Sequence, residues 1–167
     1  MAQIVVGFSR PSGWFEPFSW LIRLAYWSPF SHAYIRYSST DLGVDLIVQA
    51  SGLEINLIEQ SIFDSEEVIY KEFTLPISDE NKSAMVKFAF AQLGKPYNVL
   101  GIFGMAWVRI GQLLGLNLKS PFQYNGSSAF CSQFVAYILE NYDNIDFGNV
   151  ANIAPSDIYA VLSKINA

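Results

Sequence analysis

The chain has 167 residues, of which 51% are apolar and 16% aromatic, and this composition indicates a packed globule rather than a disordered chain. Its net charge of -5, with only 10 Lys and Arg that form no cluster, argues against a nucleic-acid-binding protein. One cysteine and one histidine exclude an intramolecular disulfide and a zinc site of Cys and His ligands. We expect a single domain over residues 1–167 and no metal.

The N-terminal half of the chain predicts mainly strands. Residues 3–9 predict a short buried strand, and residues 15–27 place apolar side chains at helical spacing. No basic segment precedes a long apolar run, so we expect no signal peptide and a cytoplasmic protein, or one that another machine delivers elsewhere. Four short segments rich in β-branched and aromatic residues then predict an antiparallel meander. These segments are residues 32–38, 45–51, 53–59 and 66–75.

Helices are expected in the C-terminal half. Residues 78–94 predict a helix, because Ser78 is a candidate N-cap, acids occupy the first turn, and Gly94 closes the segment. Another helix is expected to begin near Ser128, and residues 154–165 predict a last helix. Together the segments predict an α+β fold in which an antiparallel sheet packs against helices.

A long apolar stretch runs from residue 97 to residue 118. Its only charge is Arg109, and its 22 residues would be long enough to cross a bilayer. The central arginine and four glycines make a spanning helix costly. Three interpretations stay open: a spanning segment, a core helix followed by a loop, and an apolar wall or lid near the site that meets lipid or an apolar substrate.

The only cysteine, Cys131, lies where a polar loop gives way to an apolar run, in the sequence NGSSAFCSQFVAYILE. If Ser127 or Ser128 caps a helix here, Cys131 falls in its first turn. Backbone N–H groups and the helix dipole favour an anion there, so the thiol pKa would be lowered and its reactivity raised. Lone cysteines are also common as inert packing residues, and this alternative stays open.

The only histidine opens a predicted strand whose alternation sends His32 and Tyr34 to one face. A histidine that deprotonates a thiol needs a third polar group to orient its ring. Gln49 lies in an otherwise apolar run of the next strand, and its amide carbonyl could accept the histidine N–H. Glu54 and Asn56 are the substitutes if the strand register differs. A hydrogen-bonded core histidine and a solvent-facing glutamine are the alternative interpretations.

The order of several short motifs resembles the circularly permuted papain-like group of NlpC-type cysteine hydrolases, notably its YiiX-like branch. Lecithin:retinol acyltransferase-like proteins belong to the same permuted group. The motifs are SHAYIRY, a strand ending VQAS, LGKPYN, FCSQFV and APSDIY. In papain-type enzymes the cysteine precedes the histidine, whereas here His32 lies 99 residues before Cys131, as permutation requires.

This resemblance implies a helix with the nucleophile at its N-terminus, packed against an antiparallel sheet that bears the base. It implies Cys131 as nucleophile, His32 as general base and Gln49 as the third polar residue, a place where relatives often have an acid. Tyr97, in GKPYN, matches a tyrosine near the site and would donate a hydrogen bond to the oxyanion alongside the Cys131 backbone N–H. A packing tyrosine beside a proline turn is the alternative.

The expected reaction is acyl transfer through a thioester, without a cofactor. We expect hydrolysis of an amide bond in a peptide, isopeptide or peptidoglycan-type substrate. A lipid acyltransferase, thioesterase or esterase is the first alternative, and a non-catalytic binding or structural module is the second. The aromatic run from Trp14 to Phe30 suits an acyl chain or a flat peptide or sugar surface, and it is compatible with a peripheral membrane contact.

Overall fold

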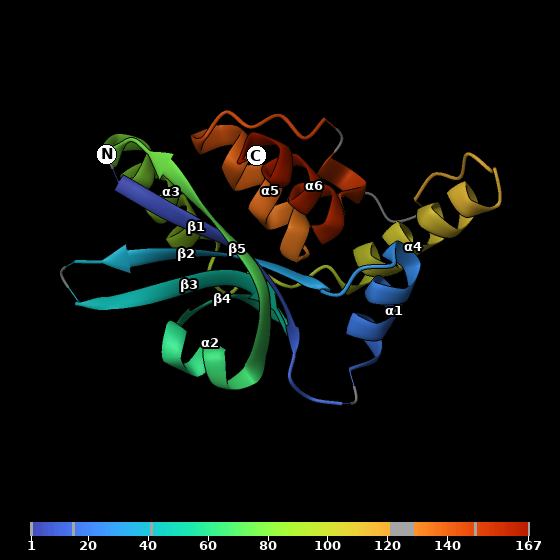
Figure 1. Cartoon of the computed structure of the whole chain (residues 1–167), viewed down its shortest axis with the longest axis horizontal. Helices are drawn as coiled ribbons and strands as arrows, with labels where there is room; N and C mark the ends of the chain where they lie inside the picture. The colour runs from blue at the N-terminus through green and yellow to red at the C-terminus, as the bar shows by residue number, and fades with distance from the viewer. Residues whose placement is uncertain (1, 15, 41, 121–128, 149, 167) are drawn as a thin grey trace.

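The protein is described by a computed structural model that covers residues 2–14, 16–40, 42–120, 129–148 and 150–166. It has an α+β fold in which a five-stranded antiparallel sheet packs against helices (Figure 1). The strands lie in the order β4-β3-β2-β1-β5. Their bounds are β1 Ala2–Pro11, β2 His32–Ser39, β3 Val44–Ser51, β4 Glu54–Glu59 and β5 Glu67–Ile77.

One face of the sheet holds the main core and is covered by helices α3 (Asp79–Gln92), α5 (Cys131–Tyr142) and α6 (Pro155–Ile165). In Figure 1, α5 and α6 lie together above the sheet, on the opposite side from α2. Strand β2 contributes Ala33, Ile35 and Tyr37 to this core, and its alternate residues face the other way. The predicted alternation of this strand is therefore confirmed. A short 3-10 helix, Val150–Asn152, precedes α6.

The other face of the sheet carries a smaller cluster under helix α2 (Gln60–Glu66), which the sequence pattern did not predict. This helix has seven residues and buries only Phe63, so it has too little local periodicity to be recognised. Phe63 packs against Tyr34 of β2, with ring centroids 4.4 Å apart. The position of α2 therefore depends on a contact between residues far apart in the sequence, which the local sequence pattern does not reveal.

The apolar stretch from residue 97 to 118 forms helix α4 (Val99–Leu113) followed by a loop. The helix is only partly buried, so the interpretations as a helix plus loop and as an apolar wall near the site both fit the structure. Within the described residues, no helix is both long and apolar enough to cross a membrane. The Asn98 side chain caps α4 by accepting a hydrogen bond from the Gly101 N–H at 2.8 Å. A Cβ on Gly101 would lie 2.8 Å from the Phe130 ring, so glycine permits α4 to pack against the start of α5.

Helix α1 (Pro17–Tyr26) packs against α4, and the two helices lie at one end of the molecule, away from α2 and α3 (Figure 1). The pair shares a small core with the start of α5, in which Ile22 and Ile102 contact Phe130. A hydrogen bond between the buried Ser19 and Ser31 hydroxyls, 2.6 Å apart, links α1 to the residue before β2. The two helices are thereby fixed beside the end of the sheet where β2 begins.

Candidate active site

Helix α5 begins at Cys131, so the predicted place of the cysteine in a first helical turn is confirmed. Phe130 occupies the N-cap position, and the Gln133 side chain accepts a hydrogen bond from the Phe130 N–H at 3.3 Å. Ser127 and Ser128, the expected caps, lie outside the described residues. The cap is therefore made by a residue at the third helical position rather than by a serine hydroxyl.

Cys131 is only 2% exposed. Its thiol lies near the N-terminal end of β2, before the first residue of β2 that pairs with β3. The paired residues of β2 and β3 begin at Ile35 and Val48, which leaves the preceding edge of β2 free. The thiol faces this edge and approaches the Ser31 carbonyl oxygen at 3.9 Å. The helix thus delivers the sulfur to the backbone beside His32.

Burial raises the pKa of the Cys131 thiol above its ordinary value. The backbone N–H groups of Ala33 and Ser132 and the Tyr97 hydroxyl oppose this rise, because hydrogen bonds to the sulfur stabilise a thiolate. The expectation of a lowered pKa is therefore wrong for the substrate-free protein. Helix-terminal donors are present, but the loss of water around the sulfur outweighs them.

Alkylation of Cys131 by iodoacetamide should accordingly be slow at neutral pH. Its rate should rise with a midpoint above the ordinary thiol value of 9.0, because only the thiolate reacts. The Tyr97→Phe variant, which lacks one donor to the sulfur, should have a still higher midpoint. Alkylation rates of both proteins across an alkaline pH series test this expectation, and a midpoint below 9.0 would contradict it.

His32 and Gln49 form a short side-chain hydrogen bond at the site: the imidazole Nε2 donates to the amide Oε1 at 2.6 Å. Both side chains are buried. Of the three polar residues considered for this place, Gln49 is thus the one that contacts the ring. Gln49 is paired with Asn56 of β4, so the two side chains lie on the same face of the sheet. Glu54, at the start of β4, is exposed to solvent.

Because Nε2 carries the proton that is donated to Gln49, Nδ1 of the neutral imidazole carries a lone pair and can act as a base. Burial lowers the pKa of His32, while the Glu67 charge and the Gln49 hydrogen bond raise it in part. The ring is therefore neutral near pH 7, as a general base must be. Among the described residues, Asn56 Oδ1 is buried next to Gln49 without a hydrogen-bond partner.

The thiol and the imidazole lie at the same end of β2 without a direct hydrogen bond between them in the described part of the chain. The imidazole belongs to the face of β2 that carries Tyr34, with ring centroids 6.4 Å apart, whereas α5 covers the opposite face. The sulfur instead approaches the carbonyl of Ser31, the residue before His32. Both residues thus lie near the first residues of β2, and their pairing as nucleophile and base stays a prediction.

Tyr97 lies at this place as well, with its hydroxyl close enough to Cys131 for a hydrogen bond that favours the thiolate. Its backbone N–H donates to the Leu53 carbonyl at 2.8 Å, and the residue also forms a parallel bridge with Ala129. Burial holds the pKa of the Tyr97 hydroxyl well above its usual range, so it stays a donor. Tyr97 thus lies beside Cys131 and in the same cavity wall as His32, while its role in the reaction stays a prediction.

A cavity of about 160 Å³ opens at these residues. His32 and Tyr97 contribute polar groups to its wall, and α1 and α4 contribute apolar side chains. The apolar part of the wall is formed by Phe18, Ile22, Val99 and Ile102. The cavity is small, largely apolar and provided with a few polar groups, as in many small-molecule sites.

Glu67 is a residue of the site that the sequence pattern did not reveal. It opens β5, lines the same cavity, and accepts a hydrogen bond from the Ser9 hydroxyl at 2.8 Å. Its charge raises the pKa of His32. A register shift between Phe8 and Ser9 in the β1–β5 pair sets its position, and no local sequence signal gives the position of that shift.

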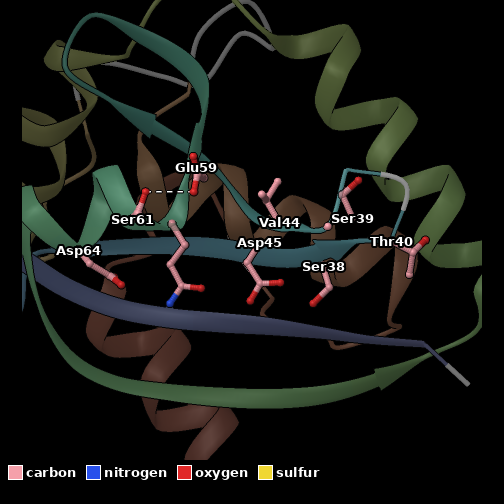
Figure 2. A pocket seen from close by; sticks show the side chains of 10 residues that line it. Ser38, Ser39, Thr40, Val44, Asp45, Glu59, Ser61 and Asp64 are labelled. Carbon is pink, nitrogen blue, oxygen red and sulfur yellow. Dashed lines mark hydrogen bonds between the residues drawn. The ribbon is translucent and has the colours of Figure 1, made fainter.

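A larger hollow of about 640 Å³ lies at the opposite end of β2 and β3, beside α2 (Figure 2). Its polar side chains are hydroxyls, carboxylates and the amide of Gln60, and the Ser61 hydroxyl donates a 3.0 Å hydrogen bond to Glu59. Asp45 on its wall is paired with Arg36 at 2.9 Å. Neither cavity has Cys131 among its lining residues, but the smaller one is lined by His32, Tyr97 and Ser31, whose carbonyl oxygen the sulfur approaches, so the smaller cavity is the candidate active site.

Comparison with known proteins adds no family assignment. The chain matches no protein-family model. It also has no match among curated proteins. The resemblance to permuted papain-like hydrolases therefore rests on the short sequence motifs alone.

Proposed function

We propose that the protein is a cysteine hydrolase that cleaves an amide bond through a thioester on Cys131. The observation that supports this proposal is that the sulfur of the only cysteine lies 3.9 Å from the carbonyl oxygen of Ser31, the residue before the only histidine. Gln49 orients the histidine, and Tyr97 lies against the thiol. Of these three residues, Tyr97 contacts the thiol directly, whereas Gln49 contacts His32.

The proposed fold assignment is a circularly permuted papain-like arrangement. It is supported by a helix that starts with the cysteine and packs on an antiparallel sheet whose neighbouring strands bear His32 and Gln49. The histidine strand precedes the cysteine helix in the chain, as this arrangement requires. Relatives often have an acid where this chain has Gln49, and the nearby Glu67 supplies a carboxylate from a different strand.

In the proposed reaction, His32 Nδ1 takes the proton of the Cys131 thiol while the sulfur attacks the amide carbon. The protonated imidazole then gives this proton to the leaving nitrogen as the C–N bond breaks, which leaves a thioester and a free amine. Water, deprotonated by His32, attacks the thioester. The acid is released, and the thiolate recovers the proton.

Substrate binding has two tasks in this mechanism. It must bring the thiol and Nδ1 into hydrogen-bond contact, since such contacts are often long in substrate-free enzymes and shorten in the reactive complex. It must also place the carbonyl oxygen between the Tyr97 hydroxyl and the Cys131 backbone N–H, which would stabilise the oxyanion. Because burial raises the pKa of the thiol, we propose that proton transfer accompanies the attack.

Glu67 is proposed to stabilise the imidazolium, because Gln49 is neutral. The Glu67→Gln variant should lose about tenfold in kcat. Its acidic limb in the pH profile of kcat/KM should move to lower pH, since removal of the negative charge lowers the pKa of His32. The Glu66→Gln variant, which changes the exposed neighbouring acid, is the matched control and should keep the parental profile. An unchanged profile in Glu67→Gln would contradict this role.

A second candidate function is acyl transfer or hydrolysis on a lipid, and the apolar cavity wall from α1 and α4 favours it. A screen of the purified protein against peptidoglycan fragments, isopeptides, aryl esters and phospholipids distinguishes the two. Amide turnover that Cys131→Ala abolishes would support the first function, whereas turnover of phospholipid alone would support the second. Absence of turnover on every class would favour a binding module.

A further inference from the structure

Helices α1 and α4 expose apolar side chains where a surface helix ordinarily exposes polar ones. In α4 the exposed residues recur at intervals of three and four, which places them on one stripe. The exposed stripe of α1 shows the same spacing. We call these two stripes the α1–α4 face; it contains Trp20 and Leu24 of α1 and Leu100, Phe103, Trp107 and Ile110 of α4.

The two helices that carry these stripes pack against each other. The rings of Phe18 and Phe103 contact each other edge to face across the two helices, with centroids 5.9 Å apart. Both rings remain partly exposed. In Figure 1 the helix pair stands at one end of the molecule, where neither the sheet nor α2 covers it. An exposed apolar surface of this extent is typical of a site that meets another apolar surface.

The tryptophans of the chain are concentrated in and beside these two helices. All four, Trp14, Trp20, Trp27 and Trp107, belong to α1, its flanking residues or α4, and each is between 51% and 88% exposed. No tryptophan is in the core. Tryptophan combines an apolar ring with a polar N–H and is enriched at the boundary between membrane and water, which suits this distribution.

The charge of the two helices is opposite to that of the whole chain. The chain has a net charge of -5, yet neither α1 nor α4 contains an Asp or Glu, and each contains one arginine. Arg23 lies over the Trp20 ring at 5.9 Å and Arg109 over the Tyr26 ring at 5.5 Å. Neither arginine forms an ion pair within the described residues, and Glu16 lies just before α1.

We propose that the α1–α4 face binds to the surface of a bilayer that contains anionic lipids. The apolar stripes would enter the interface, and Arg23 and Arg109 would contact lipid phosphates. A second copy bound through the same face would instead bring unpaired arginines close together. Helix α4, with 15 residues, is about 22 Å long, shorter than the roughly 30 Å hydrocarbon layer, and suits a position in the plane of the interface.

This docking would bring the candidate active site close to the lipid surface. The wall of the active-site cavity includes Phe18 and Ile22 of α1 and Val99 and Ile102 of α4. The same two helices therefore form the α1–α4 face and one side of the cavity. Membrane binding does not depend on the proposed chemistry, because the surface consists of residues other than Cys131, His32 and Gln49.

The test uses the full chain with Cys131→Ala, so that turnover plays no part in the result. Vesicles of phosphatidylcholine alone and of phosphatidylcholine with phosphatidylglycerol are sedimented with the protein, and tryptophan fluorescence is recorded. We expect binding to anionic vesicles to be at least tenfold tighter, to weaken with salt, and to shift the emission to the blue. Alkaline washing should release the bound protein.

Two matched variants locate the surface. The Trp107→Glu variant should weaken binding to anionic vesicles at least tenfold, since it places a carboxylate in the centre of the face. Ile62→Glu changes a side chain on α2 with the same 51% exposure and should bind like the parent. Absence of binding, equal binding to neutral vesicles, or parental binding by Trp107→Glu would overturn the proposal. So would a dimer that Trp107→Glu dissociates, because a second copy would then cover this face.

Discussion

Replacement of Cys131 by alanine is expected to abolish turnover of any substrate that the screen identifies. The sulfur is the only atom of the chain that can form the proposed thioester, so no neighbouring group can replace it. The fold should persist with a loss of about 1 kcal/mol in unfolding free energy, because the substitution removes one buried atom from the end of a helix. Steady-state rates and thermal unfolding measure the two effects separately.

His32 variants should show an equally large loss of turnover. His32→Ala combined with Cys131→Ala should be no worse than either alone, since nucleophile and base act as one unit. The histidine is buried, so His32→Gln is the better variant for preserving packing. Near-parental turnover in a folded Cys131→Ala protein would contradict the cysteine mechanism, whatever the outcome for His32.

Gln49→Ala should lower kcat by roughly tenfold to a thousandfold, less than loss of the base itself. The reason lies in the 2.6 Å contact from His32 Nε2 to the amide oxygen, which fixes the ring so that Nδ1 is directed away from the amide. Without this contact the imidazole would still reach the thiol for part of the time. Pre-steady-state rates of acylation, together with an unfolding curve, separate lost orientation from lost stability.

Gln49→Glu changes the electrostatics at the same hydrogen bond. A carboxylate would hold Nε2–H and also stabilise the imidazolium, so the pKa of His32 should rise. The acidic limb of the pH profile of kcat/KM should therefore move to higher pH, the opposite of the shift expected for Glu67→Gln. The shift belongs to the coupled thiol and imidazole rather than to one group. Parental rate and pH dependence in both Gln49 variants would show that Gln49 has no role and would make Asn56 the residue to test.

Local sequence patterns were sufficient for most of the elements around the site. Alternation in β2 correctly separated the core residues from the face that carries His32. Ser78 caps α3 as predicted, with its hydroxyl accepting a hydrogen bond from the Asn81 N–H at 3.0 Å. Gln49 was recognisable as a polar residue in an apolar strand, because burial of such a side chain requires a partner. These features depend on neighbours a few residues apart.

Other features depend on long-range packing and could not be predicted from the sequence. The register shift in β1 brings Glu67 to His32, and the Phe63 ring fixes α2 against Tyr34. Burial reverses the expected pKa shift of Cys131, since the exclusion of water depends on several elements at once. The exposure of α1 and α4 is likewise a tertiary property, because both segments are apolar enough to have been core.

The most direct test of the account is the mass of the protein during turnover of an activated acyl substrate. Rapid quenching and intact-mass measurement should show one added acyl group, which peptide mapping should place on Cys131. Hydroxylamine at neutral pH should remove it, since it cleaves thioesters. Cys131→Ala should show no adduct. Turnover that proceeds without any adduct on Cys131, and at the same rate in Cys131→Ala, would contradict the assignment of Cys131 as the nucleophile.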